Sequence, residues 1–279
     1  MRKDRRLFCE LSPFCYQISV RKEALKKDAR DLVRGTRIAK KRQSQSLPCI
    51  WKSDAKLIKR RLEGVDMQLQ INKATNLRLA AEKLDGLVVL PGETFSFWNT
   101  VGQATAAKGY LEGLVIHRTE LKSGVGGGLC QMANLIHYLV LHSPLEVTEL
   151  HHHSDALFPD FKRRVPFGTG TSICYKSLDY RFKNTSAHPV QLRIWVQDGE
   201  MLMGELRSSV PLSQKYRLVE ENHHYAQDDD GVFYRNSLVY RLVTDRESGA
   251  LVRKELVLRN HSRVLYDPSL IPPEEIRTP

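Results

Sequence analysis

Apolar residues recur at helical spacing in the first half of the chain. Residues 131–141 form the clearest such segment. In residues 76–84 one helical face is apolar: Leu77, Ala80, Ala81 and Leu84. Weaker patterns predict helices over residues 22–32 and 53–62, the second with Ser53 as its N-cap. Helices are therefore expected early in the chain.

Alternation of apolar and polar residues dominates the second half and predicts strands. Four segments carry it: residues 178–182, 189–196, 232–243 and 250–258. Gly199 and Gly204 indicate a hairpin after the second of these, and residues 245–249 indicate a turn between the last two. A short apolar run at residues 87–90 predicts one buried strand earlier in the chain. Helices early and antiparallel strands late indicate an α+β fold.

Charge is distributed unevenly along the chain. Residues 1–42 contain 14 Lys and Arg against five Asp and Glu, so they carry +9 of the net charge of +11. Such a block is kept where solvent or an anionic partner relieves its repulsion. We therefore expect residues 1–42 to lie outside the catalytic core and to contact an anionic membrane surface, with a solvated face as the alternative. No nucleic-acid partner is favoured.

Charge and pattern together divide the chain into three parts. These are a basic N-terminal segment over residues 1–62, a core domain over residues 63–206 and a β-rich extension over residues 207–279. No apolar run reaches the roughly 18–20 residues of a membrane-spanning helix, which argues against an integral membrane protein. The start of the chain lacks the apolar stretch of a secretory signal, so we expect a cytoplasmic location, including the inner membrane surface.

Several familiar sites are not expected. The five cysteines are widely spaced, unlike a disulfide framework, and no Cys-x-x-Cys pair suggests a zinc knuckle. The glycines at 126–128 lack the Lys-Ser/Thr that follows a phosphate-binding loop, so neither a nucleotide nor another cofactor is expected. Residues 228–231 lack the ligand spacing of a calcium loop and are expected to form a turn.

One segment combines a glycine run with a cysteine near the start of a predicted helix. Three glycines precede Cys130 and Gln131: Gly126, Gly127 and Gly128. Glycines are kept where side chains cannot fit or where φ is positive. The unpaired N–H groups and the positive dipole end of a helix N-terminus favour a thiolate and a developing oxyanion. Cys130 is therefore a candidate nucleophile, with a small buried cysteine at a tight junction as the alternative.

A histidine cluster at residues 151–153 offers partners for this thiol. Residues two apart point the same way in an extended segment, so His151 and His153 can face one site while His152 faces outward. One of them would act as base or acid for Cys130, and the other would bind or orient. Two alternatives stay open: a catalytic-type zinc site of His151, His153 and Cys130, and a solvated histidine run without a role.

Four motif blocks occur in a fixed order. They are residues 91–97 (PGETFSF), residues 126–131 (GGGLCQ), the His151-x-His153 pair and residues 178–184 (LDYRFKN). In this order they closely resemble the VanW family, over a stretch from about residue 72 to about residue 205. The resemblance implies an accessory role in vancomycin resistance connected with the cell wall. Related domains are implicated in cysteine-dependent L,D-transpeptidation of peptidoglycan.

Carried onto this chain, the resemblance implies roles for individual residues. Cys130 would be the acyl-enzyme nucleophile, and His151 or His153 its partner. The motif blocks supply the expected substrate contacts: Glu93, Phe95, Gly126, Gly127, Gly128 and Gln131.

The chain departs from the family pattern at two positions. Leu150 stands where the family has an Arg, and Gly170 where it usually has an Asp, so Asp179 would have to take over that carboxylate's role. Two hypotheses follow. The protein is either an acyl transferase acting on a peptidoglycan precursor or stem peptide, or a non-catalytic module that binds such a peptide through N–H groups of the glycine loop.

Overall fold

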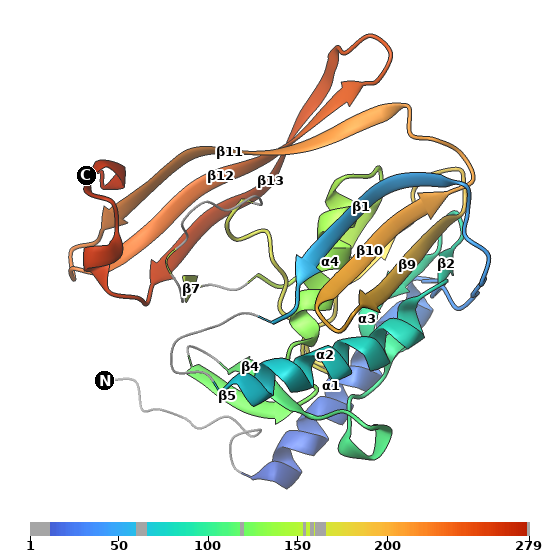
Figure 1. The fold of residues 1–279 in the computed structure, drawn as a ribbon, viewed down its shortest axis with the longest axis horizontal. Coiled ribbons are helices and arrows are strands. Elements are labelled where there is room, and N and C mark those ends of the chain that lie inside the picture. The colour runs from blue at the N-terminus through green and yellow to red at the C-terminus, as the bar shows by residue number, and fades with distance from the viewer. Residues whose placement is uncertain are drawn as a thin grey trace.

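The computed structural model describes residues 12–59, 66–117, 120–152, 155–156, 159 and 166–277. Its helices are α1 (Pro13–Val33), α2 (Met67–Leu84), α3 (Phe97–Val101) and α4 (Leu129–Leu141), with short 3-10 turns η2 (Ala106–Lys108), η3 (Pro268–Leu270) and η4 (Pro273–Glu275). Its strands are β1 (Cys49–Leu57), β2 (Val88–Val89), β3 (Thr94–Ser96), β4 (Glu112–His117), β5 (Glu120–Val125), β6 (Glu146–Glu149), β7 (Asp155–Ala156), β8 (Arg181–Lys183), β9 (Val190–Gln197), β10 (Met201–Ser208), β11 (Gln214–Gln227), β12 (Phe233–Asp245) and β13 (Leu251–Val264). These helices and mostly antiparallel sheets confirm the expected α+β fold (Figure 1).

A four-stranded sheet has the order β1-β10-β9-β2. This sheet and the helices α2 and α4 that pack on it are called the body of the molecule below. β9 and β10 form the hairpin predicted at Gly199, whose φ of +67° suits the turn. α2 packs against β9, and α4 packs against β1 and β10. Gly204 lies within β10, where an added Cβ would stand 2.9 Å from Cδ2 of Leu135. The absence of a side chain at Gly204 therefore lets α4 approach the sheet closely.

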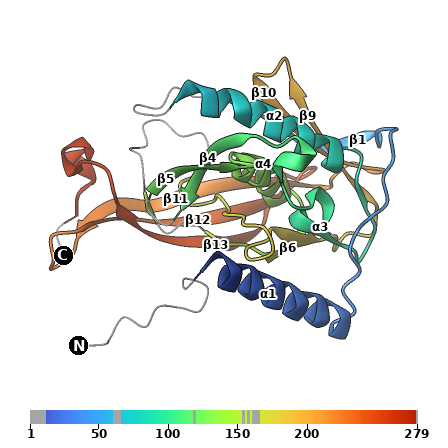
Figure 2. The same ribbon diagram turned by 90° about the horizontal axis from the view of Figure 1, so that it is seen from below.

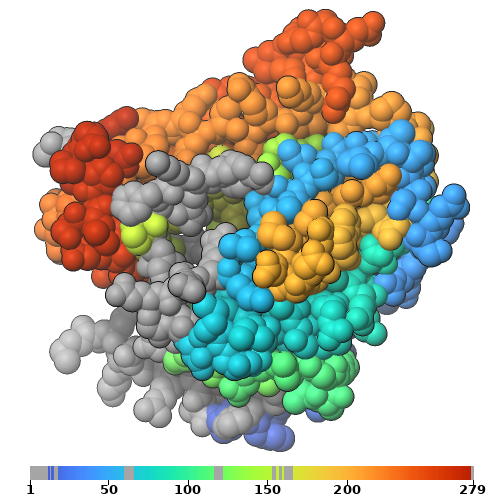
Figure 3. Space-filling view, viewed as in Figure 1, coloured from blue at the N-terminus to red at the C-terminus, as the bar shows by residue number. Residues whose placement is uncertain are grey.

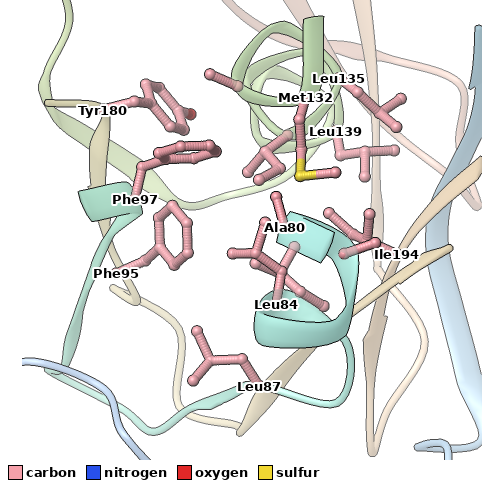
Figure 4. Packing of buried hydrophobic residues seen from close by; sticks show 14 of the residues in the cluster. Ala80, Leu84, Leu87, Phe95, Phe97, Met132, Leu135, Leu139, Tyr180 and Ile194 are labelled. Carbon is pink, nitrogen blue, oxygen red and sulfur yellow. The ribbon is translucent and has the colours of Figure 1, made fainter. Parts of the chain in front are cut away.

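The main hydrophobic core lies between this sheet, α2 and α4 (Figure 4). Leu84 of α2, Leu135 of α4 and Ile194 of β9 meet there, all buried. Beside them Phe95 of β3 stacks on Phe182 of β8, with ring centroids 4.9 Å apart. Each such fully buried side chain contributes about 1.5–3 kcal/mol relative to its exposed state, so this core holds α4 firmly in place.

Two helices confirm the sequence patterns that predicted them. α4 covers the helix predicted over residues 131–141, and α2 covers residues 76–84 and ends at Asp85. Both begin earlier than predicted, α4 at Leu129 and α2 at Met67. α1 likewise contains the helix predicted over residues 22–32, but it starts at Pro13.

β1 corrects the helix predicted over residues 53–62 for residues 53–57, which form a strand, and residues 60–62 lie outside the described residues. This segment pairs antiparallel with β10, from Cys49 opposite Ser208 to Leu57 opposite Met201. Trp51 is buried and its Nε1–H donates to the carbonyl oxygen of Val210 at 2.7 Å. Partners on a neighbouring strand override a local preference for helix. The segment before residue 62 thus adds a strand to the body, and the proposed boundaries at residues 62 and 206 stay predictions.

The C-terminal strands form a second four-stranded sheet with the order β11-β12-β13-β7, along the upper edge of the face in Figure 3. β12 and β13 confirm two predicted strands, and residues 228–231 form the expected turn, closed by Val232 N–H donating to Asp228 Oδ1 at 2.7 Å. β11 is one of the longest strands of this sheet and includes His223. A small core of Tyr225, Val264 and Ile271 supports this sheet.

α1 lies along one edge of the body (Figure 2). Its Lys27 Nζ is 2.8 Å from Glu149 Oε1 and 3.5 Å from Asp179 Oδ2. Asp31 accepts two hydrogen bonds from Arg181 Nη1, at 2.7 and 2.8 Å. This part of residues 1–42 is therefore tied to the body through its polar inner face. None of the helices in the described part of the chain is long and apolar enough to span a bilayer.

Candidate functional site

The glycine run packs tightly against its surroundings. An added Cβ on Gly127 would lie 2.1 Å from the carbonyl carbon of Gly113, and one on Gly128 would lie 2.2 Å from Cγ of Lys73. Gly126 and Gly128 also have positive φ, +81° and +96°. These positions thus have packing and backbone reasons to be glycine. Their expected contacts with substrate stay predictions.

Asn76 of α2 holds the glycine loop in place by hydrogen bonds to Leu111 and Gly127. Its Nδ2 donates to the carbonyl oxygens of Leu111, at 2.9 Å, and Gly127, at 3.0 Å, while its Oδ1 accepts from Leu111 N–H at 2.8 Å. The side chain is fully buried. Sequence reasoning missed Asn76, although an amide beside the apolar face of a predicted helix was the available signal.

Replacing Gly127 by alanine is expected to destabilise the fold by about 1–3 kcal/mol, because the new methyl group would overlap the backbone of Gly113. Urea unfolding monitored by circular dichroism measures this loss. Gly124→Ala is the matched control, since its Cβ would lie 3.4 Å from the side chain of Val115. An equal loss in both variants would contradict the tight approach of the two loops.

Cys130 is the second residue of α4, whose N-cap is Gly128 and whose first residue is Leu129. Its side chain is partly buried, and Sγ lies 3.9 Å from the carbonyl oxygen of Ile173. Burial raises the pKa of the Cys130 thiol above its usual value, and the neighbouring Cys174 adds to this, while the Ile173 contact lowers it. The raised pKa favours the protonated thiol at neutral pH.

His151 is oriented by a carboxylate that the sequence did not single out. Its Nε2 is 3.1 Å from Oε1 of Glu149, the last residue of β6. A carboxylate accepts hydrogen bonds, so Nε2 carries the proton and Nδ1 is left as the basic nitrogen. His152 is exposed, as predicted, and its Nδ1 contacts the carbonyl oxygen of Gly168 at 2.9 Å. His153 lies outside the described residues.

One loop contacts both the Cys130 thiol and the backbone of His151. Ser172 N–H donates to the carbonyl oxygen of His151 at 2.6 Å, and the next residue, Ile173, contacts the Cys130 thiol. Asn134, one turn after Cys130 on α4, fixes the same loop through Thr171 N–H at 2.6 Å. Within the described ranges, no hydrogen bond joins the thiol to the imidazole directly. Such contacts are often long before a substrate binds.

Asp179 belongs to a cluster of charged side chains that also includes Lys27, Glu149 and Arg181. Through Glu149 this cluster adjoins His151. Its buried carboxylate accepts from Ser96 Oγ at 2.6 Å and from Arg181 Nε at 2.8 Å. Its own N–H donates to Glu149 Oε1 at 3.1 Å, the oxygen that also contacts His151. The backbone of Asp179 thus contacts Glu149, while its carboxylate pairs with Ser96 and Arg181, and a role of that carboxylate in the site stays a prediction. Arg181 gains a raised pKa here, because its pairs with Asp179 and other carboxylates outweigh desolvation.

The other expected substrate contacts are spread over the structure. Glu93 closes the turn before β3 by accepting Leu90 N–H at 2.9 Å. Phe95 is fully buried in the core, so no surface of it faces a ligand. Gln131 Nε2 donates to the carbonyl oxygen of Leu57 at 2.9 Å. The structure gives each of these three residues a contact within the fold, and their contacts with substrate stay predictions.

The two departures from the family pattern both fall near the site. Leu150 packs against the main core beside His151. An added Cβ on Gly170 would lie 3.3 Å from Oδ1 of Asn134, so a larger residue there would press on the amide that fixes the loop. The acidic partner of His151 is Glu149, which precedes the altered position 150 by one residue.

The zinc alternative required Cys130, His151 and His153. Among the residues that the structure describes, no group of three His, Cys, Asp or Glu side chains is placed to hold a metal ion. Because His153 is outside them, the alternative stays a prediction. The sulfur and imidazole donors that are described suit acid–base chemistry, with Nδ1 of His151 basic.

Two buried histidines, His137 on α4 and His142 at its C-cap, are kept neutral. Burial lowers the pKa of His137 to about 3, with a smaller contribution from His152, and lowers that of His142 to about 4. His137 Nδ1 contacts Tyr180 Oη at 3.2 Å. Unfolded histidines bind protons below about pH 6.5, whereas these two do not, so the fold loses stability as the pH falls.

Acidification from pH 6.5 to pH 5 is expected to lower the free energy of unfolding by about 1.6 kcal/mol for each of these histidines, because the unfolded histidine passes from half to almost full protonation over this range. Urea unfolding at the two pH values measures the loss. His142→Gln should reduce it by about half of the combined effect, because one of the two protonations is removed. An unchanged loss in this variant would contradict the neutral state of His142.

Comparison with known proteins shows which class of protein this α+β fold belongs to: the chain is a member of the VanW family. Its residues 72–205 match the family described as "VanW like protein". It is similar to the Vancomycin B-type resistance protein VanW of Enterococcus faecalis (strain ATCC 700802 / V583), with 31% identity over 204 residues, which cover 73% of each chain.

A second relative is the uncharacterized protein YoaR of Bacillus subtilis (strain 168). It is 31% identical over 148 residues, which cover 53% of this chain and 47% of that one, so the match spans about half of that relative. No protein of known structure matches significantly.

Proposed function

We propose that this protein acts in vancomycin resistance as a cysteine-dependent acyl transferase on a peptidoglycan precursor. The resistance role is suggested by the name of the Enterococcus relative. The acyl-transfer role rests on one observation: the thiol of Cys130 and the backbone of His151 contact neighbouring residues of one loop, with the His151 ring held by Glu149. Nucleophile, base and orienting carboxylate are the three parts such a reaction uses.

In the proposed reaction, Nδ1 of His151 takes the thiol proton as Sγ of Cys130 attacks a peptide carbonyl carbon. N–H groups at the start of α4 stabilise the oxyanion. The C–N bond then breaks, His151 returns the proton to the leaving amine, and a thioester remains on Cys130. An acceptor amine then attacks the thioester carbonyl carbon and gives a proton to His151. The new C–N bond forms as the C–S bond breaks, and His151 returns the proton to the released Cys130 thiolate.

A base is needed because the thiol is protonated at rest. Burial raises the pKa of Cys130, so little thiolate exists without His151. Glu149 would stabilise the imidazolium that forms, at its present distance of 3.1 Å. The proposed substrate is a precursor stem peptide, because a cytoplasmic protein would meet precursors and not the crosslinked wall.

The test combines a synthetic stem peptide, in which an L-residue precedes a D-residue, with a second peptide as acceptor amine. Mass spectrometry of the products should show transfer by the natural protein. His151→Asn should slow it by about 10²–10⁴-fold, the usual contribution of a general base. His152→Asn is the control, because that exposed ring contacts only the rim of the site at Gly168. No transfer by the natural protein, or equal rates in both variants, would refute the proposal.

A second candidate is a non-catalytic module that binds the same peptides. The raised pKa of Cys130 and its contact with Ile173 favour it, because a desolvated, protonated thiol is a poor nucleophile. In this case Cys130→Ser should leave binding of the stem peptide nearly intact in calorimetry, and no transfer should be seen. Loss of all binding in a folded Cys130→Ser variant would count against it.

A further inference from the structure

The outer face of α1 carries an apolar stripe that no other part of the described chain covers. Four large apolar side chains on it are exposed: Phe14 (72%), Ile18 (40%), Leu25 (69%) and Leu32 (82%). They are 4, 7 and 7 residues apart, and at 3.6 residues per turn these steps return to the same side of the helix. Single exposed apolar residues are ordinary, but an aligned row of four is a binding surface.

The side of α1 that contacts the body determines which way the stripe faces. Ala24 is buried, Lys27 pairs with Glu149, and Asp31 pairs with Arg181. α1 therefore faces the body with buried Ala24 and the ion pairs of Lys27 and Asp31, and it presents its larger apolar side chains to the outside. In Figure 2 it lies below the other elements, with its lower side open. A helix kept only for its packing would have the reverse arrangement.

Basic side chains accompany the stripe. Arg21 and Lys22 lie between Ile18 and Leu25, and four exposed basic residues of the helix outnumber its exposed acids, Glu23 and Asp28. The basic residues are Arg21, Lys22, Lys26 and Arg30. Long basic side chains can lie along an apolar surface while their charges stay at its polar boundary. This pattern fits an interface that is apolar within and anionic at its edge.

We infer that α1 is an interfacial helix that docks this protein on an anionic phospholipid surface through Phe14, Ile18, Leu25 and Leu32. Such a helix lies in the plane of the bilayer boundary with its apolar side chains inserted and its Lys and Arg on the headgroups. A second copy is the less suitable occupant, because two α1 helices of the same positive charge would repel each other.

Docking in this way would place the candidate site next to the bilayer. Lys27 of the docked helix contacts Glu149, and the same Glu149 oxygen contacts His151. The inference does not depend on the proposed acyl transfer, since it rests on α1 alone. Failure of one can therefore be told apart from failure of the other.

Co-sedimentation with vesicles of equal phosphatidylglycerol and phosphatidylcholine tests the inference on the full chain. The natural protein should sediment with these vesicles, and binding should fall with added salt, because exposed charges are screened over about 8 Å at physiological ionic strength. Changing Leu25 and Leu32 together to Glu should weaken binding at least about tenfold, because two inserted leucines and their charge match are lost.

The matched control changes Leu251 and Leu256 of β13 to Glu. These leucines are also exposed, at 58% and 43%, and the double change alters the net charge equally. Binding by this control should stay within about threefold of the natural protein. Circular dichroism confirms that both variants keep the fold.

Three outcomes would overturn the inference. One is equal weakening by the two double variants, and another is no vesicle binding by the natural protein at low salt. The third is a dimer in sedimentation velocity that the α1 double variant abolishes while vesicles bind neither protein. That result would assign the stripe to a second copy of the chain.

Discussion

Acyl transfer is expected to fall by at least about 10³-fold when Cys130 is replaced by alanine. In the proposed reaction this sulfur forms the covalent intermediate, so its removal leaves only binding and oxyanion stabilisation. The side chain is small and sits at a helix start with one weak contact, to the carbonyl oxygen of Ile173. The fold should therefore tolerate the change. Product formation from the paired stem peptides, measured by mass spectrometry, gives the rate.

Cys49→Ala is the matched control for this prediction. Cys49 is also a free, partly buried cysteine, but it lies at the start of β1, near the carbonyl oxygen of Ser209. Its replacement should leave the rate within about twofold, as expected for a surface change distant from the chemistry. Transfer that survives Cys130→Ala would remove this residue from the mechanism.

Asp179→Asn is expected to destabilise the fold by about 3–5 kcal/mol, the usual loss when one partner of a buried ion pair is removed. The Asp179 side chain is 2% exposed and that of Arg181 8%, so the remaining positive charge could not return to water. Lys27 would lose its contact with the same carboxylate, which loosens the attachment of α1. Urea unfolding at pH 7 measures the change.

Glu221→Gln provides the comparison for an exposed pair. Glu221 pairs with Lys254 at 2.8 Å, with side chains 46% and 40% exposed. This pair should be worth no more than about 1 kcal/mol. A loss at Asp179 no larger than the loss at Glu221 would show that the charged cluster is not the support described above.

The parts of the site that sequence predicts well are local in the chain. The glycine run and the helix after it follow from residues 126–141 alone, because positive φ and helical periodicity are local properties. The structure accordingly confirms α4 and places Cys130 in its first turn. The loop contacts of these glycines, such as Gly127 against Gly113, required the folded chain.

The supporting charges could not be predicted because they come from distant segments. Lys27 and Asp31 belong to α1, Glu149 ends β6, and Arg181 begins β8. No periodic pattern in the sequence links these residues. The net charge of residues 1–42 instead predicted contact with an anionic membrane surface, and not ion pairs within the fold. The helix predicted at β1 was wrong for a related reason: this segment forms a strand because it pairs with β10, about 150 residues later in the chain.

Phe95 shows how a motif can mislead about function. It stands within the family's PGETFSF block, which suggested a contact with substrate, yet its ring is buried against Phe182. Motif residues can hold the scaffold of a site as well as form its surface. Glu149 is the converse case, since it touches His151 from just outside the conspicuous histidine run.

A covalent peptide on Cys130 tests the account most directly. The protein is incubated with the donor stem peptide without an acceptor, quenched in acid and measured by intact mass and peptide mapping. We predict a mass increase equal to the acyl part of the donor, located on Cys130 and reduced in His151→Asn. An unmodified protein that still binds the peptide, or an acyl group carried by another residue, would contradict the account.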